Sequence, residues 1–436
     1  MVYSGRCKIT SYSFGASLPI HLNLSPGGQC LVLACGGGWK NRTPFLQFCT
    51  LPGTQDAPKF PTMKTIDTGL ADMIKFTAVS DSRKLIFAAD WSRIRSFAWG
   101  SADADFEHAL PTHTMNSEAF DGPLAILAGG SRIVRAGTGR AAIWDLETLP
   151  THGPEGKDMI GGQFDVEDSW RCDPECIEPS GGAEETTTIQ FEDKLLKPSI
   201  WRSHPGGSEG AMLCALDCNV LEQANYSVVA LDLEHGGKVM SRHLGHGAKI
   251  NEMSTSSGDP YMFATMCDGG FARVWDVRQP LPTLTCDVGF TEDALCGGLA
   301  LAHPGGIPSM FLFLYIFRVS TFEFLLILHP LALFTGANKQ EEIRLWDLRA
   351  RSVVYELGTG NNSATSLAWD GERNALYAAT HCYYTEATRR NYRKAEIPRN
   401  PEEDRDRYWP KDAYHDEHYF GSPFNAGKNL ICEWQP

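Results

Sequence analysis

The sequence predicts an all-β fold, a single seven-bladed β-propeller, on three observations. A short apolar strand that ends in an aromatic residue or a Trp-Asp pair recurs along the 436 residues. The chain contains 42 Gly and 25 Pro, and these residues supply the turns that many short strands need. No long stretch has the 3.6-residue apolar period of an amphipathic helix.

The recurring strand sets the number of blades. Its successive copies are 50, 46, 86, 45, 71 and 86 residues apart. A four-stranded blade takes about 40–45 residues. Three steps therefore fit one blade each, and the three long steps contain insertions or further blades. The copies are centred on Phe48, Ala98, Trp144, Ala230, Trp275, Trp346 and Cys432.

Two segments without strand periodicity account for the two steps of 86 residues. Residues 150–185 are rich in Gly, Pro and acidic residues, and residues 384–427 carry a run of mixed charge. Removing about 35–40 residues from each restores the step of one blade. We therefore expect one propeller over residues 10–434, with both segments as loops on its rim. The repeats are clearest at 94–147, 227–278 and 334–380.

The step of 71 residues contains an apolar run, 309–334, that is long enough to span a membrane. Arg318 and Glu323 each oppose insertion by about 2.5–3.5 kcal/mol, whereas thirteen Leu, Ile, Val or Phe residues each favour it by about 0.3–0.6 kcal/mol. The sum is close to zero, and a span here would put blades of one ring on opposite sides of the membrane. We interpret residues 309–333 as an insertion foreign to the repeat, such as translated intron sequence. The alternatives are a partner-binding or membrane-surface hairpin and a true membrane span.

Three copies of the strand end in a Trp-Asp pair: Trp144-Asp145, Trp275-Asp276 and Trp346-Asp347. A Gly-His pair, Gly245-His246, precedes the second of them by about one repeat body. With these motifs the chain resembles the WD-repeat family over most of residues 10–434. The resemblance implies a buried hydrogen-bonded chain that links His246, a strand hydroxyl, the turn residue Asp268 and Trp275. The turn that carries Asp268 is one residue longer than the family pattern.

The resemblance implies a non-catalytic scaffold that binds other proteins. The two rim segments are then the expected contact regions, and the second gathers Arg and aromatic side chains, which are enriched in binding hot spots. These include Arg389, Arg390, Arg393, Lys394, Tyr408, Trp409, Tyr414, Tyr419 and Phe420. We expect the aromatic part, 408–424, to pack back against the propeller.

A narrower hypothesis concerns Arg278 and Arg349, which follow two of the pairs in the form Trp-Asp-x-Arg. This form is similar to the motif of WD-repeat substrate receptors of cullin-RING ubiquitin ligases. The resemblance implies that both arginines contact the ligase adaptor. The competing interpretation pairs each arginine with a carboxylate of a neighbouring blade. A propeller enzyme of unknown type and a membrane-associated WD-repeat protein are further alternatives.

Composition and motifs disfavour several classes of function. The net charge of −14 argues against nucleic acid as a partner, because phosphate binding depends on Lys and Arg. The sequence contains no nucleophile elbow, Gly-Lys-Ser/Thr phosphate loop or His-Glu-x-x-His motif, so it predicts no catalytic residue and no cofactor. The pairs Cys172/Cys176 and Cys214/Cys218 fit zinc spacing loosely, and we interpret them as reduced thiols rather than as a metal site. Thirteen Cys without a signal peptide predict a cytoplasmic or nuclear protein.

Overall fold

The computed structural model describes residues 4–9, 18–51, 62–100, 109–167, 169–217, 226–256, 258–289, 296–303, 332–337, 341–382, 384, 392–394, 408–419 and 430–435. Regular structure in these ranges is β-strand, apart from three 3-10 turns at Trp39–Asn41 (η1), Ala128–Gly130 (η2) and Pro174–Cys176 (η3). No helix in the same ranges is long and apolar enough to cross a membrane.

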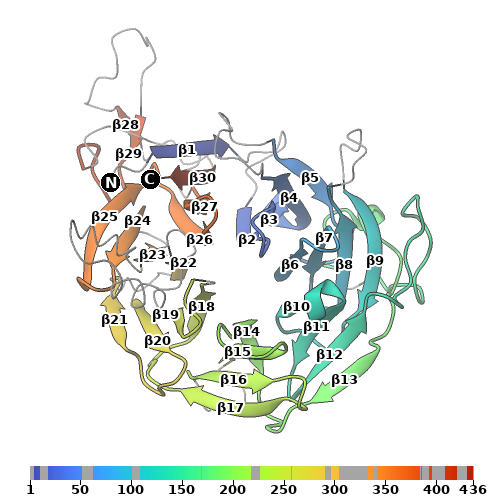
Figure 1. The fold of residues 1–436 in the computed structure, drawn as a ribbon. Helices are drawn as coiled ribbons and strands as arrows, with labels where there is room; N and C mark the ends of the chain where they lie inside the picture. Colours follow the sequence, from blue (N-terminus) through green and yellow to red (C-terminus); the bar gives the residue numbers. More distant parts are fainter. Residues whose placement is uncertain are drawn as a thin grey trace, which may run out of the picture. The chain divides into compact units, whose positions relative to one another are not determined.

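The described strands build seven four-stranded antiparallel sheets, the blades of a β-propeller, and this confirms the predicted fold class. By its contacts the chain divides into two compact units, one built mainly from residues 7–242 and the other mainly from residues 243–428. Figure 1 labels the strands of each sheet.

The unit of residues 7–242 holds four sheets, each with its strands in chain order. The first two sheets consist of β2 (Leu18–Leu24), β3 (Cys30–Gly37), β4 (Thr43–Thr50) and β5 (Lys64–Asp67), and of β6 (Phe76–Ser80), β7 (Leu85–Ala89), β8 (Arg93–Ala98) and β9 (Leu110–Asn116). The next two consist of β10 (Leu124–Leu127), β11 (Arg132–Gly137), β12 (Arg140–Asp145) and β13 (Thr187–Gln190), and of β14 (Pro198–Ser203), β15 (Ala211–Leu216), β16 (Val228–Asp232) and β17 (Lys238–His243).

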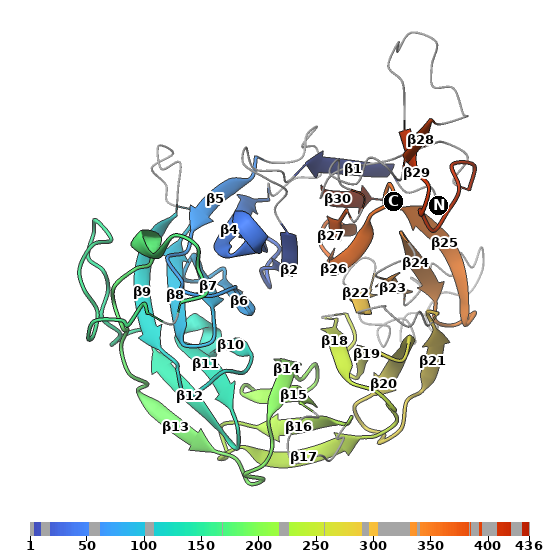
Figure 2. The same cartoon turned by 180° about the vertical axis from the view of Figure 1, so that it is seen from behind.

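The first strands of neighbouring sheets contact one another in this unit, in the order β2, β6, β10 and β14 (Figures 1 and 2). Apolar side chains of adjacent sheets meet between them. Val32 and Leu46 of the first sheet, for example, belong to one buried cluster with Ile86 and Phe97 of the second. The core of this unit therefore lies between successive sheets. Full burial of each such side chain stabilises the fold by about 1.5–3 kcal/mol.

The unit of residues 243–428 holds one sheet of β18 (Ile250–Thr255), β19 (Met262–Cys267), β20 (Phe271–Asp276) and β21 (Leu284–Asp287). Its second sheet consists of β22 (Cys296–Ala302), β23 (Ala332–Ala337), β24 (Glu342–Asp347) and β25 (Ser352–Gly358). The seventh sheet has the order β26 (Ser363–Asp370), β27 (Ala375–His381), β30 (Leu430–Gln435) and β1 (Ser4–Ile9). A separate two-stranded ladder joins β28 (Tyr392–Lys394) to β29 (Tyr408–Pro410).

The seven sequence positions that set the blade number all fall in the third strand of a sheet, which is β4, β8, β12, β16, β20, β24 or β30. A third strand has a neighbour on each edge and packs on both faces, so most of its side chains are buried whether or not it ends in Trp-Asp. In β16, Val228 to Leu231 are fully buried although this blade lacks the pair.

The predicted insertion 309–333 interrupts a continuous hairpin. β22 pairs directly with β23, and Ala302 and Leu301 lie opposite Ala332 and Leu333. The last two residues of the predicted insertion, Ala332 and Leu333, therefore belong to β23 and are buried in its sheet. The rest of it lies in residues 304–331, outside the described ranges.

Candidate functional site, an interaction surface

The three Trp-Asp pairs end third strands. Their indoles are buried, Trp144 in β12, Trp275 in β20 and Trp346 in β24. The carboxylates of Asp145, Asp276 and Asp347 each accept the backbone N–H two residues later, at 2.8–2.9 Å. In each pair the tryptophan therefore belongs to the core, and the aspartate stabilises the turn that follows the strand.

The structure brings His246 and Trp275 together on one hydroxyl. Oγ1 of Thr265 lies 2.6 Å from Nε2 of His246 and accepts the indole N–H of Trp275 at 2.7 Å. Arg273 donates to Nδ1 of His246 at 2.7 Å, which leaves the ring hydrogen on Nε2. Burial, and secondly the charge of Arg273, lower the pKa of His246 to about 3, so the imidazole is neutral at physiological pH.

Asp268 lies apart from this chain. Its carboxylate accepts the side-chain amide of Asn251, and the longer turn that follows it passes through Gly270 at a φ of 74°. The position next to the imidazole is taken by Arg273, which lies opposite Thr265 in the ladder between β19 and β20. The extra turn residue thus separates the predicted turn aspartate from His246.

The two Trp-Asp-x-Arg arginines bind their own Trp-Asp carboxylates rather than those of a neighbouring blade. Arg278 makes two bonds to Asp276, at 2.8 and 2.5 Å, and its guanidinium lies 4.1 Å from the ring centroid of Tyr261. Arg349 lies 3.8 Å from Asp347. The side chains remain 62% and 50% exposed, so contact with an adaptor stays a prediction.

Residues 150–185, predicted as a rim loop, dock on the outer strand of the second sheet. The backbone of Ala183 donates to the carbonyl of Thr114 and accepts from the N–H of Asn116, each at 2.9 Å. The indole of Trp144 donates to the same Ala183 carbonyl at 3.2 Å. The segment therefore covers part of the exposed edge of β9 with its own backbone.

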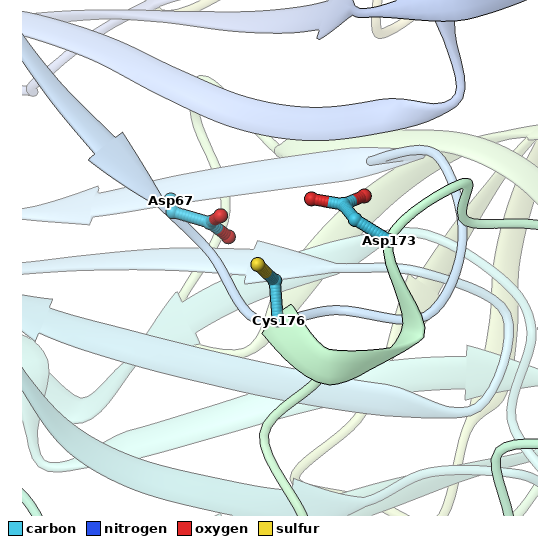
Figure 3. A group of neighbouring side chains, drawn as sticks. All are labelled: Asp67, Asp173 and Cys176. Carbon is cyan, nitrogen blue, oxygen red and sulfur yellow. The ribbon is translucent and has the colours of Figure 1, made fainter.

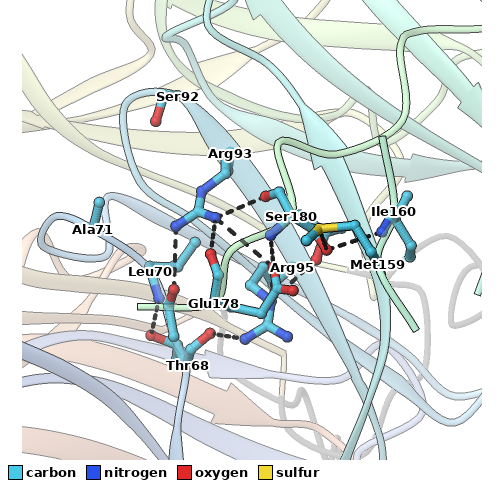
Figure 4. A network of polar contacts seen from close by, with 12 residues as sticks. Thr68, Leu70, Ala71, Ser92, Arg93, Arg95, Met159, Ile160, Glu178 and Ser180 are labelled. Atoms are coloured by element: carbon cyan, nitrogen blue, oxygen red, sulfur yellow. Dashed lines mark hydrogen bonds and ion pairs between the residues drawn. The ribbon is translucent and has the colours of Figure 1, made fainter. Parts of the chain in front are cut away.

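Arg93 holds this segment from inside the protein (Figure 4). Its guanidinium donates to the carbonyls of Glu178, Ser180 and Gly69 at 2.6, 2.9 and 3.2 Å, and lies 3.6 Å from the ring centroid of Phe164. Only 1% of the residue is exposed. Because an unpaired buried charge is costly, these carbonyls and the segment that carries them are held firmly.

Arg95 adds a second buried cation beside the first. It donates to the carbonyl of Thr68 and, at 3.1 Å, to the hydroxyl of Thr114. Burial lowers the pKa of Arg95 to about 10, so the guanidinium stays charged at neutral pH. The carboxylate of Glu178 lies 3.8 and 3.9 Å from Arg93 and Arg95 and balances part of their charge.

One group of possible metal ligands lies where this segment meets β5 (Figure 3). The ligand atoms of Asp67, Asp173 and Cys176 all lie within 4.8 Å of one another. The buried guanidinium of Arg171 donates to both carboxylates, at 2.9 Å each, and holds the pKa of Asp173 below its usual value. Since a guanidinium already binds both carboxylates, we interpret the group as an ion cluster that fastens the segment.

The other thiols of the two Cys-x3-Cys pairs lie in different surroundings. Sγ of Cys172 contacts the carbonyl of Trp39 at 3.4 Å. Cys214 is fully buried in β15, where burial raises its pKa far above the usual value. Cys218 lies outside the described residues.

Three exposed tryptophans lie on loops of the first two sheets and on the docked segment. Trp39 in η1 is 66% exposed, Trp91 in the β7–β8 turn is 49% exposed, and Trp170 in segment 150–185 is 52% exposed. Each ring contacts a cation. The contacts run from Lys40 and Arg42 to Trp39 at 4.4 and 5.4 Å, from Arg42 to Trp170 at 3.9 Å, and from Lys75 to Trp91 at 4.5 Å. We call these six residues the tryptophan face.

A buried carboxylate positions two of these loops. Asp90, which is fully buried, accepts the backbone N–H groups of Ala71 and Asp72 at 3.1 and 3.3 Å. It also accepts those of Ser92 and Arg93, at 2.9 and 2.7 Å, on the turn that presents Trp91. One side chain therefore ties the β5–β6 loop to the β7–β8 turn.

The residues before and after Trp170 fix its backbone in place. The hydroxyl of Ser169 and the N–H of Arg171 both donate to the carbonyl of Ala71, at 2.9 and 3.1 Å. The N–H of Trp170 itself binds the carboxylate of Asp72. With these groups fixed, the indole projects outward from an anchored backbone.

Trp39 lies in a strained turn. Lys40 and Asn41, which follow it, have φ angles of 56° and 58°, in the left-handed region that non-glycine residues rarely adopt. Such conformations cost about 1–3 kcal/mol each and cluster at functional sites. The strain here presents an indole to solvent.

The segment 384–427 is described in part, and residues 408–419 pack against the β22–β25 sheet as predicted. The N–H of Tyr414 donates to Glu341 at 3.1 Å, and His415 lies 3.0 Å from the carboxylate of Glu342. Trp409 is buried. Arg389, Arg390 and Phe420 lie outside the described residues.

Sequence reasoning missed the tryptophan face. Its residues come from four separate segments, and none of them belongs to a recognisable motif. A signal was nevertheless present, because each tryptophan stands in a turn-forming stretch close to a cation, in GGGWKNR (36–42), DWSR (90–93) and SWR (169–171).

No protein-family model matches the chain, and no curated protein sequence matches it either.

Proposed function

We propose that this protein is a non-catalytic scaffold of the WD-repeat type that binds other proteins, and that the tryptophan face is its principal contact surface. The observation that carries the proposal is the exposure of Trp39, Trp91 and Trp170 on one connected set of loops. Tryptophan and arginine are the residues most enriched in binding hot spots. Exposed apolar area gathered on one surface marks an interaction site, whereas single exposed apolar residues do not.

The fixed loops support the proposal on energetic grounds. Binding is weakened when loops must be ordered at the moment of contact. Asp90 and Arg171 bind backbone groups of the β5–β6 loop, and Asp90 also binds those of the β7–β8 turn, before any partner arrives. The surface is therefore preorganised, as expected of a docking platform.

Assignment to the WD-repeat type is supported by the buried chain of His246, Thr265 and Trp275 and by the three Trp-Asp pairs. We place the scaffold in the cytoplasm or nucleus. The ten cysteines resolved as free thiols in the described ranges are consistent with a reducing compartment.

Affinity purification of the tagged full chain, followed by mass spectrometry, tests the proposal. The variant Trp39→Ala/Trp91→Ala/Trp170→Ala should lose the specific partners by roughly tenfold or more. The matched control replaces three leucines that are exposed on other loops: Leu195→Ala/Leu244→Ala/Leu281→Ala. Partners that survive equally in both variants, or a wild-type chain that recovers none, would contradict it.

A second candidate is a substrate receptor of a cullin-RING ligase. The observation that favours it is the exposure of Arg278 and Arg349, each directly after a Trp-Asp pair. Pull-down of the cullin adaptor by the full chain should be lost in Arg278→Ala/Arg349→Ala. Adaptor binding that persists in this variant excludes the motif as the contact.

A further inference from the structure

We propose that the tryptophan face binds an acidic segment of a partner protein in which Asp or Glu residues alternate with aromatic or aliphatic ones. This inference rests on the proposed function and names the chemistry of the partner. It follows from the charge, the exposed apolar area and the order of groups on the face.

The cations of the face lack ion-pair partners. Lys40, Arg42 and Lys75 form no salt bridge to a carboxylate among the described residues, and Nε of Arg42 is buried without an acceptor there. Arginines elsewhere in the same unit, such as Arg132 and Arg171, do bind carboxylates. Lys75 acts on the carboxylate of Asp72 only at longer range. In a chain of net charge −14, three cations on one surface that form no salt bridge to a described carboxylate are complementary to an acidic partner.

The indoles supply the apolar part of the contact. A cation stacks on each ring of the face. Even so, Trp39, Trp91 and Trp170 remain 66%, 49% and 52% exposed. Aromatic rings of this size carry large contact areas with little loss of side-chain entropy. A partner made only of acidic residues would leave this area in water, so the partner needs apolar side chains as well.

Contacts on the face alternate between indoles and cations. Arg42 contacts both Trp39 and Trp170, and Lys75 contacts Trp91. Between Trp170 and Lys75 lies the half-buried carboxylate of Asp72, whose pKa is raised by burial and next by Asp90. An extended segment with alternating acidic and apolar side chains matches this order.

A single-stranded nucleic acid is the competing ligand, because bases stack on aromatic rings and phosphates bind cations. Two observations disfavour it. The carboxylates of Asp67, Asp72 and Asp173 lie beside the face, and the net charge of the chain repels a polyanion. The separate carboxylates of a peptide can each bind one of the three cations. A continuous phosphate backbone would also lie close to the acidic groups, which repel it.

Selection from a random peptide library displayed on phage, with the full chain as bait, tests the inference. We expect the enriched peptides to combine Asp or Glu with Trp, Phe or Leu, and to bind more weakly as salt is raised. They should bind Lys40→Glu/Arg42→Glu/Lys75→Glu roughly tenfold more weakly or worse. The control Lys157→Glu/Lys194→Glu/Lys238→Glu makes the same change in net charge at exposed lysines elsewhere and should bind like the wild type.

The outcomes separate this inference from the proposed function. Peptides that are neutral or basic, but that are lost in the triple tryptophan variant, would overturn the acidic partner and leave the scaffold standing. No peptide that depends on the face would overturn both. Tighter binding of an oligo-dT probe than of the selected peptides would replace the inference with nucleic acid. If the triple charge reversal fails to fold, Lys40→Glu/Lys75→Glu keeps Arg42 in place and should still weaken binding.

Discussion

Thr265 places a single hydroxyl between two buried rings, those of His246 and Trp275. We predict that Thr265→Val lowers the free energy of unfolding by about 2–4 kcal/mol, because valine keeps the shape of threonine but leaves two buried N–H groups without their acceptor. Urea unfolding at neutral pH measures the change.

Thr335 provides a matched control for this prediction. Among the residues that the structure describes, its hydroxyl accepts only the indole N–H of Trp346, at 2.9 Å. Thr335→Val should therefore destabilise the protein by about 1–2 kcal/mol, half as much as Thr265→Val. Equal losses from the two substitutions would refute the shared role of Thr265.

His246 makes stability depend on pH. Its pKa is lowered from 6.5 to about 3, so its contribution is complete above about pH 6.5 and is lost progressively as the pH falls toward 3. Between about pH 7.5 and pH 5 the wild type should lose about 2 kcal/mol more unfolding free energy than His246→Gln, whose side chain does not titrate. Urea titrations of both proteins at the two pH values measure this.

Other histidines with a lowered pKa do not disturb this comparison. The pKa values of His21 and His113 are lowered to about 4, but both residues are present in the wild type and in the variant, so their contributions cancel. Parallel pH profiles for the two proteins would show that His246 is protonated as easily in the folded state as in the unfolded state.

At the scale of elements, the docking of residues 150–185 on β9 depends on a glycine. Gly182 has a φ of 100°, and a Cβ there would lie 2.5 Å from the backbone N of Asn116. We predict that Gly182→Ala detaches this part of the segment at a cost of about 1–3 kcal/mol, because both the φ angle and the backbone contact oppose a side chain. Faster hydrogen exchange at the N–H of Asn116 reports the detachment.

Gly162 is the matched control on the same segment. A Cβ at Gly162 would meet nothing within 4 Å, and its φ is outside the left-handed region. Gly162→Ala should therefore leave the exchange at Asn116 unchanged. Fast exchange in both variants would mean that the docking tolerates little change anywhere in the segment.

Strands that are buried on both faces could be recognised from the sequence, whereas the partly exposed docked segment could not. Third strands such as β16 were recognisable because both of their faces pack in the core. The docked segment showed no strand period, because the carbonyls of Glu178 and Ser180 bind the side chain of Arg93, and Ala183 forms an isolated bridge to β9 rather than part of a regular ladder. The tryptophan face combines residues far apart in the chain, and only the fold brings them together.

The sequence motifs identified part of the hydrogen-bond network around Trp275 and missed the rest. The Gly-His and Trp-Asp patterns led to His246 and Trp275, which do share a hydroxyl. The place beside the imidazole could not be predicted, because one added residue in the turn moves Asp268 away and lets Arg273 approach from the facing strand. Turn length changes which side chains meet, even where the strands keep their register.

At the scale of the whole molecule, the direct pairing of β22 with β23 bears on the apolar run. Ala302 lies opposite Ala332, so the two strands need only a short connection. We predict that deletion of residues 309–331, which keeps Ala332 and Leu333, leaves the melting temperature within about 4 °C of the wild type, since no described strand is shortened. Thermal unfolding followed by circular dichroism measures it.

A second deletion sharpens this test. Removing residues 309–333 also takes away Leu333, which is fully buried opposite Leu301. Loss of such a core leucine costs about 2–5 kcal/mol, so this chain should melt clearly lower. If the shorter deletion is the more damaging one, the apolar run contributes to folding and is not foreign to it.

The seventh sheet has a consequence for the synthesis of this protein on the ribosome. In the described chain the other six sheets take four consecutive strands, so each can form once its own stretch has emerged. β1 instead pairs with β30, and at about 5–20 residues per second it waits roughly 20–90 seconds for that partner. An unpaired strand edge readily pairs with the wrong chain. Slow translation or crowded polysomes should therefore endanger residues 4–9 more than any other strand that the structure describes.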